Sequence, residues 1–424
     1  MVKKSRNWCT PFRSGILCSV LCTILGTYAH ADFGSAKISA MGGAGTANPQ
    51  DSFSQAYNPA TSAWLCPRGD VGLDILLQQK EVEITGNTSS PITSDGHYHS
   101  TRGAVFLPSF GFLNRFNECT TYGVTLTPVH FTKTHYEIDI PALGGLTGVH
   151  ARHDLHVAKL SLHAARVFEG CNVVGFSVDF YAARFKLDGA GALSAAGTTP
   201  FTTSKFGKVT DNGYDYSGGI SFTVGWMKEI CQDLNLGLAY SHEVHLAKFD
   251  RYCGFLAKGD LNIPSIVRVG LSYRGFNCWT LAADYELRLW NRIRAMRNSF
   301  PDEGAGGTGK GWGFDWKNSW SAKVGAAYEF DQCWTFRLGY RHERLPVRTN
   351  SSGSFLNVLI VNTVENVLTS GIGYALSQST EFNIDFDVGF SHKVKGGIPS
   401  QVGAGNYNMQ EKFYKIGFSL GHHF

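Results

Sequence analysis

Segments of about ten residues in which apolar and polar side chains alternate recur through most of the chain. Three of them are EFNIDFDVGFSH (381–392), WTLAADYELRLW (279–290) and WTFRLGYRHER (334–344). Because successive side chains of a strand point to opposite faces, each segment predicts a strand with one apolar and one polar face. A soluble sandwich would show such alternation too. Repeated strands of this length are typical of a membrane barrel, with the apolar face toward lipid and the polar face toward the lumen.

Both ends of the chain favour the membrane interpretation. Basic residues precede a short apolar run, GILCSVLCTILG (15–26), and Ala29-His30-Ala31 supplies small residues for cleavage, which predicts a secretory signal peptide over residues 1–31. The apolar run is too short to span a bilayer as a helix. The last residues, YKIGFSLGHHF, alternate and end in Phe424. This ending is typical of bacterial outer-membrane barrels, and we expect the barrel-assembly machinery to recognise Phe424.

Short polar turns alternate with longer connections rich in Gly, Ser, Thr and Asn. The short turns are 115–123, 167–175, 228–237, 274–281, 329–336 and 374–382, and the longer connections include 189–214, 294–315 and 395–411. Short turns on one side and long loops on the other are the pattern of an outer-membrane barrel. We therefore predict an all-β, 14-stranded antiparallel transmembrane barrel over residues 67–424, with both termini in the periplasm. Only a closed barrel satisfies strand backbones in lipid.

Residues 32–66 precede the first expected strand and differ from the rest of the chain. They contain a run of small residues, Gly42-Gly43-Ala44-Gly45, and a turn signal, Asn58-Pro59-Ala60. Glycine permits close packing, and proline fixes its own backbone angle. A barrel of 14 strands has a lumen too wide for its own side chains to fill. We predict that residues 32–66 fold back into the lumen as a plug.

The sequence also resembles a known family. Residues 35–65, SAKISAMGGAGTANPQDSFSQAYNPATSAWL, and residues 313–347 are similar to the FadL/TodX family of outer-membrane transport proteins, in which the NPA triplet is the hatch motif. The resemblance implies a plugged barrel for passive uptake of hydrophobic molecules, typically long-chain fatty acids or aromatic hydrocarbons. Ligand would bind among the extracellular loops, pass an interior site and a rearranged hatch, and leave sideways into outer-membrane lipid through a kink in strand three.

The third predicted strand contains an irregularity in its alternating pattern where such a gap is expected. In TYGVTLTPVHFTKTHY (121–136) the apolar positions change parity after Pro128, where Val129 and Phe131 follow. Proline cannot donate to the ladder, and a one-residue change of parity is what a bulge produces. We predict that Pro128, Val129 and Phe131 border the lateral gap. An ordinary bulge without a transport role is the alternative.

Fatty-acid carboxylates require a cation, and the resemblance points to Arg184 and Lys310. Arg184 shares the parity of the outward residues Val174 to Phe180, so it would face the lumen only after a bulge. Solvated charges at the rim and in a loop are the alternative for the two residues. Apolar loop residues are further candidates for a groove that binds an alkyl chain, with packing between loops as the alternative. They are Phe201, Phe355, Leu356 and Leu359.

Seven of the ten cysteines follow the predicted signal peptide, and five of these seven lie in five of the six short turns. They are Cys119, Cys171, Cys231, Cys278 and Cys333. Free thiols are unusual in an oxidising compartment. Turns around a ring are too far apart for bonds within one chain, which need Cα atoms within about 7 Å. We predict disulfides to other envelope proteins, and a structural or adhesive barrel cross-linked in this way is the alternative function.

Other function classes lack support in the residues. The formal net charge of +4 and the absence of a basic run give no basis for nucleic-acid binding. No serine or histidine stands out as part of a catalytic triad, so we predict that the protein is not an enzyme, with a lipase in the barrel wall as the remaining alternative. No metal site and no cofactor are predicted.

Overall fold

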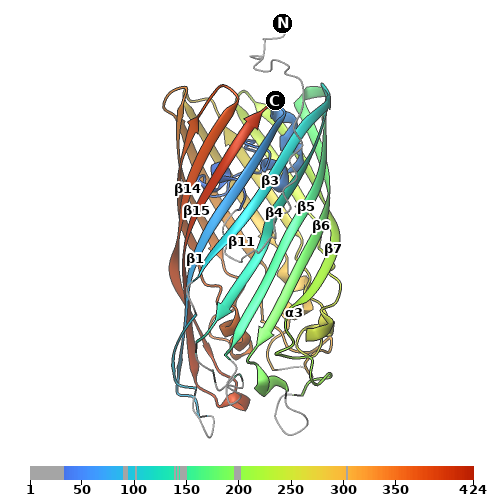
Figure 1. The fold of residues 1–424 in the computed structure, drawn as a ribbon, viewed down its shortest axis with the longest axis vertical. Helices are drawn as coiled ribbons and strands as arrows, with labels where there is room; N and C mark the ends of the chain where they lie inside the picture. The colour runs from blue at the N-terminus through green and yellow to red at the C-terminus, as the bar shows by residue number, and fades with distance from the viewer. Residues whose placement is uncertain are drawn as a thin grey trace.

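The computed structural model describes residues 33–88, 94–100, 103–137, 140, 143, 150–194, 202–301 and 304–424, with the side chains of residues 131 and 192 left out. The predicted signal peptide therefore lies outside the described residues. The strands form one antiparallel barrel, in which strands adjacent in the chain pair with each other except β2 and β3, and β15 closes the wall against β1 (Figure 1). No helix in the described part of the chain is long and apolar enough to cross a bilayer.

The wall is built from strands of 4 to 18 residues. In chain order they are β1 (Arg68–Thr85), β2 (Gly96–His99), β3 (Ala104–Asn117), β4 (Thr120–His135), β5 (Arg152–Phe168), β6 (Asn172–Asp188), β7 (Asp215–Cys231), β8 (Leu234–Ser241), β9 (Ile266–Tyr273), β10 (Trp279–Arg288), β11 (Ser319–Glu329), β12 (Trp334–Arg344), β13 (Asn366–Ala375), β14 (Thr380–Gly397) and β15 (Asn406–His423).

Two of these strands share one position in the wall. β3 pairs with the first half of β1, from Arg68 to Leu77, and β2 pairs with the second half, from Glu81 to Ile84. Both lie on the same edge of β1, so together they form one interrupted strand. The barrel therefore has fourteen strand positions, which confirms the fold predicted from the alternating segments.

Alternation along the strands separates a lipid-facing surface from a polar lumen. In β14, Ile384, Phe386 and Phe390 are 40–45 % exposed on the outside, while Asp385 and Asp387 are buried on the inside. The buried acids contact Lys415 of β15 at 3.0 and 3.3 Å. The polar side chains thus form ion pairs inside the barrel, and the apolar side chains meet the membrane.

The barrel has two unlike ends. At the short-turn end, strands are joined by the six short connections from β3–β4 to β13–β14. The long-loop end carries most of the helical turns and a hydrophobic core of its own. Helix α3 (Arg294–Arg297) and the 3-10 turns η4 (Gly191–Ser194), η5 (Asp250–Tyr252), η6 (Ala257–Gly259), η7 (Trp290–Arg292), η8 (Ser352–Leu359) and η9 (Ser400–Val402) lie in the long loops, whereas η3 (Glu169–Cys171) forms a short turn.

Residues 33–66, the hatch segment, lie inside the barrel toward the short-turn end (Figure 1). The segment contains helices α1 (Ala36–Ser39) and α2 (Ser54–Tyr57) and the 3-10 turn η1 (Pro59–Trp64). Its polar groups bond to wall strands around the lumen, which fixes it in place. These contacts are Gly34 N to Asp74 (2.8 Å), Gly42 N to Thr369 (2.9 Å), Thr46 N to Asp284 (2.8 Å), Asn58 Nδ2 to the Trp226 carbonyl (3.2 Å) and Ser39 Oγ to Asp387 (3.0 Å).

Glycines of the wall make room for the hatch segment. Gly175 of β6 pairs with Gly225 of β7, and a Cβ atom on Gly175 would lie 2.3 Å from the amide nitrogen of Ala60. Other wall glycines stand against other parts of the hatch segment in the same way. They are Gly72 with Gly34, Gly111 with Ser52, Gly237 and Gly270 with Thr46, and Gly325 and Gly339 with Met41. The wall is therefore shaped to the hatch backbone.

Candidate functional site: a break in the wall and the cavity behind it

The wall is interrupted between β3 and β4. The described pairs of this ladder begin at the short turn and end at Phe110–Leu126. The next described contact between the two sides is the bridge from Ser100 to Tyr136, near the long loops. Over the interval between these contacts, the described part of β3 still pairs with β1, and β4 still pairs with β5. The interruption is thus a local break between two strands that are otherwise held in the wall.

Two prolines account for the position of the break. The register of the β3–β4 ladder, extended by two residues past Phe110–Leu126, would place Pro108 opposite Pro128. Neither residue has an amide hydrogen to donate to a ladder. Pro128 also coincides with a register shift in the β4–β5 ladder, between Pro128 and His130. The sequence analysis singled out Pro128 but missed Pro108, whose signal is the motif FLPSF within an otherwise regular strand.

The register shift changes which residues of β4 face the lumen. Before it, the buried inward residues are odd-numbered, including Thr121 and Thr125, and after it they are even-numbered, including Thr132 and Thr134. Such a change is the expected effect of a bulge. Val129 and His130, at the shift itself, line a cavity inside the barrel.

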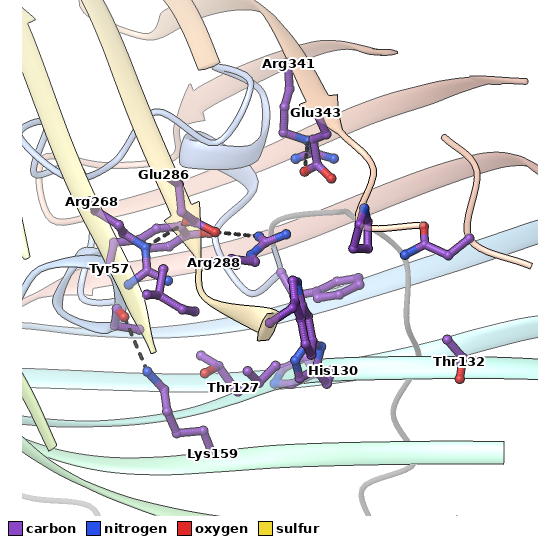
Figure 2. A pocket seen from close by; sticks show the side chains of 18 of the residues that line it. Tyr57, Thr127, His130, Thr132, Lys159, Arg268, Glu286, Arg288, Arg341 and Glu343 are labelled. Atoms are coloured by element: carbon purple, nitrogen blue, oxygen red, sulfur yellow. Dashed lines mark hydrogen bonds and ion pairs between the residues drawn. The ribbon is translucent and has the colours of Figure 1, made fainter. Parts of the chain in front are cut away.

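This cavity has a volume of about 130 Å³ and lies directly behind the break. Figure 2 shows Thr127, His130 and Thr132 of β4 on one side and Arg268, Glu286, Arg341 and Glu343 of other strands across from them. Phe33, Ala56 and Tyr57 of the hatch segment also line the cavity. The cavity is therefore enclosed by three parts of the molecule: the interrupted strand, the hatch segment and the opposite wall.

Most charges around the cavity form ion pairs. Glu286 accepts from Arg268 at 2.8 Å and from Arg288 at 2.6 Å (Figure 2). Within β12, Arg341 pairs with Glu343 at 3.1 Å, and Lys80 of β1 lies 3.8 Å from Glu411 of β15. Buried charges need such partners, because an unpaired charge away from water is strongly unfavourable.

Lys159 of β5 differs from these cations. Its side chain is 7 % exposed and lines the cavity, and its Nζ donates to the backbone carbonyl of Ala56 at 3.4 Å (Figure 2). The Asp179 carboxylate of β6 interacts with this ammonium group electrostatically, but among the described residues no carboxylate forms a direct ion pair with it. A buried ammonium with one long hydrogen bond to the hatch segment has donor capacity for an anionic group in the cavity.

Aromatic and apolar side chains lead from the cavity toward the long loops. The His130 ring lies 5.6 Å from Trp290, which makes an edge-to-face contact with Trp316 at 4.8 Å. A second, smaller cavity shares Thr132 and Trp316 with the first. The rest of its lining is mainly apolar and consists of His153, Leu155, Phe185, Leu261, Met296, Phe314 and Ile360.

The structure places the predicted hatch motif against the wall. Asn58 Oδ1 accepts from the Ala60 amide at 3.1 Å, while Asn58 Nδ2 donates to the carbonyls of Thr46 and Trp226 at 2.8 and 3.2 Å. Pro59 stands at the first position of η1. The triplet therefore shapes the turn and anchors the hatch segment to β7.

The predicted ligand cations lie away from the cavity. Arg184 faces outward, stacked over Tyr214 with 4.8 Å between the guanidinium carbon and the ring centre, because the ladders on both sides of β6 run without a register shift. The bulge required to turn it into the lumen is thus missing from this part of β6, and Arg184 occupies the rim position that was the alternative. Lys310 is exposed in a long loop.

The predicted apolar groove residues are buried rather than exposed. Phe355, Leu356 and Leu359 belong to η8 and are at most 1 % exposed within the core of the long loops. This is the packing between loops that the sequence left as the alternative. Phe201 and the side chain of Phe131 lie outside the described parts, so their roles stay predictions.

Comparison with known proteins agrees with this architecture. The crystal structure of the Pseudomonas putida toluene transporter TodX matches with a TM-score of 0.67 and 16 % identity, over 91 % of this chain and 97 % of that one. A Pseudomonas aeruginosa FadL homologue matches with 0.65 and 15 %, over 90 % and 96 %, and the Ralstonia pickettii toluene transporter TbuX with 0.62 and 17 %, over 91 % and 97 %. At these identities the likeness shows a common fold.

Sequence comparison gives the family. A search of curated protein sequences gives no match. Residues 29–402 match the model of one protein family. This range includes the hatch segment, the break and those residues lining the two cavities that precede the end of β14. The chain belongs to the outer membrane protein transport protein family (OMPP1/FadL/TodX), whose barrels lie in the bacterial outer membrane.

Proposed function

We propose that the protein is a passive channel through which long-chain fatty acids cross the outer membrane and leave sideways into the bilayer. A ligand enters among the long loops and passes the small apolar cavity. It then binds in the cavity behind the break with its carboxylate at Lys159. Movement of the hatch segment, whose Ala56 carbonyl holds Lys159 in the structure, frees the ammonium group for the ligand. The alkyl chain leaves between β3 and β4.

The observation that carries this proposal is a buried cation beside an interrupted wall. Thr127, next to Pro128, pairs with Lys159 across the β4–β5 ladder, so the ammonium group lies on the strand that borders the break. A carboxylate removed from water needs a charged donor, and such hydrogen bonds contribute about 1.5–3 kcal/mol. A hydrocarbon would make no use of this cation.

A monoaromatic hydrocarbon is the second candidate ligand. The aromatic rings of His130, Trp290 and Trp316 lie against the same cavity and would bind such a ligand by apolar and ring contacts. TodX and TbuX are described as toluene transporters. The two candidates differ in one testable respect, which is the need for a positive charge at position 159.

Uptake of radiolabelled oleate and toluene by a host without its own transporter tests the ligand. Lys159→Met keeps the apolar stem and removes the charge, so oleate uptake should fall about 10-fold to 150-fold, as 1.5–3 kcal/mol implies. Toluene uptake should stay unchanged. Lys310→Met, in an exposed loop, is the matched control and should alter neither. Loss of toluene uptake with intact oleate uptake in Lys159→Met would reject the fatty-acid assignment.

The lateral exit is tested separately by restoring ladder donors. The double variant Pro108→Val/Pro128→Val supplies amide hydrogens and β-branched side chains at the break, which favours closure of the ladder. Uptake of both ligands should fall, while the barrel still shows the heat-dependent gel mobility of a folded outer-membrane protein. Unchanged uptake in a variant with a closed wall would show that ligands leave by another route.

A further inference from the structure

Five cysteines lie at the same end of the barrel. They occupy the five consecutive short turns from β3–β4 to β11–β12, and each of them is exposed. They are Cys119, Cys171, Cys231, Cys278 and Cys333. Together these turns join ten neighbouring strands, so the five exposed cysteines are spread around most of the rim at the short-turn end. The sixth short turn, β13–β14, has serine at 377 and 379 instead.

Each of these turns also carries an exposed large apolar side chain one to three residues before its cysteine. The set is Phe116, Phe168, Ile230, Phe276 and Phe330, with exposed fractions of 47–79 %. Aromatic girdles of outer-membrane barrels lie at the membrane interface. These apolar residues are suited to lie at the membrane interface, and each cysteine follows its apolar residue by one to three positions.

All five cysteines are free, and the spacing of the wall strands disfavours bonds among them within one chain. Adjacent short turns are two strands apart, which separates them by roughly 10 Å because neighbouring strands are about 4.8 Å apart. A disulfide requires Cα atoms within about 7 Å. The short turns of bacterial barrels face the periplasm, where disulfides form and persist. The thiols thus lie in an oxidising compartment without a partner turn in reach.

We propose that this rim of thiols is a covalent interface between copies of the same chain. Copies in one bilayer share orientation and depth, so the rims of two neighbouring barrels hold their thiols at the same height. Five exposed cysteines spread around the rim allow one barrel to bond to several neighbours, whereas one protein docked on a single face would reach a few of the five turns. The expected product is a disulfide-linked array of channels.

The chemistry proceeds by thiol–disulfide exchange with a periplasmic protein or small-molecule disulfide as the oxidant. A turn thiolate attacks that disulfide and forms a mixed disulfide, which releases one thiol. The thiolate of a second copy then attacks the mixed disulfide, forms the bond between the copies and releases the second thiol. Two barrel thiols are oxidised to one disulfide, and one oxidant disulfide is reduced to two thiols.

The test uses the full chain expressed in an outer membrane, with free thiols blocked by N-ethylmaleimide before lysis. Non-reducing gels should show a ladder of multiples of the chain that collapses to monomer with dithiothreitol. Variants that keep one turn cysteine, with the other four replaced by serine, should stop at dimer because one thiol makes one bond. The variant with all five replaced should be monomeric, and Cys66→Ser/Cys253→Ser should keep the full ladder.

Several outcomes would overturn the proposal. Monomer alone from the wild-type chain, a ladder that persists in the five-serine variant, or bands in which mass spectrometry finds a different protein would each do so. Heat-dependent gel mobility verifies that every variant is folded. The five-serine variant should take up oleate like the wild type, so a failure of this proposal is distinguishable from a failure of the transport function.

Discussion

The fit between the hatch segment and the wall predicts that one added methyl group releases the hatch. A Cβ atom on Gly175 would lie 2.3 Å from the Ala60 amide nitrogen and 2.4 Å from the Pro59 carbonyl carbon. Both neighbours are backbone atoms, so the clash is relieved only if η1 moves away from β6. Overpacking of this kind costs about 1–3 kcal/mol. In Gly175→Ala the population with an undocked hatch should therefore rise about 5-fold to 150-fold.

Ion conductance of purified protein in planar bilayers measures this population, because an undocked hatch opens the lumen. Gly175→Ala should show frequent openings where the wild type shows few. Gly218→Ala, in the neighbouring strand β7, is the control, since its Cβ would be 3.5 Å from the nearest atom, the Tyr181 carbonyl oxygen. Equal conductance in the wild type and both variants would refute the idea that wall glycines hold the hatch.

Two further predictions concern charges at the hatch. Burial, with the nearby Asp70 carboxylate as the second cause, raises the pKa of Asp51 from 3.8 to about 6, so docking loses about 3 kcal/mol between pH 3.8 and pH 6. About 1.4 kcal/mol of this loss falls between pH 5 and pH 7.5, so conductance should rise about tenfold over that range in the wild type and less in Asp51→Asn. Arg68 donates to Asp70 at 2.6 Å and to Glu381 at 2.6 Å, so Arg68→Met leaves two carboxylates without this partner and should lower the free energy of unfolding by about 3 kcal/mol. A urea midpoint equal to that of the wild type would contradict the latter.

The fold was predictable because a membrane barrel determines the pattern of apolar and polar residues within each single strand. Lipid on one side and the lumen on the other force a period of two on every strand, as in residues 381–392, and short turns mark one end. The interruption between β2 and β3 was not predicted, since it depends on pairing with β1 rather than on a local signal.

The site was less predictable because it is built from distant residues. The sequence does not single out Lys159 as a ligand-binding residue. Its candidate role depends on two features that only the fold brings together, the Ala56 carbonyl of the hatch segment beside it and the break on the other side of β4. The parity of β6 had already placed Arg184 outside, and the structure follows that parity rather than the resemblance. Phe355 and Leu356 show a related limit, since an apolar loop sequence looks alike on a surface and in a core.

The prolines of β3 and β4 also affect the free energy required to keep these two strands apart inside the bilayer. At an ordinary pair of residues, separating the strands would leave amide hydrogens without acceptors, and the strands would gain free energy by rejoining. Pro108 and Pro128 carry no such hydrogens, so their separation leaves no donors unmet at that level. The two prolines therefore remove, at that level, one cost of keeping the strands apart within the hydrocarbon.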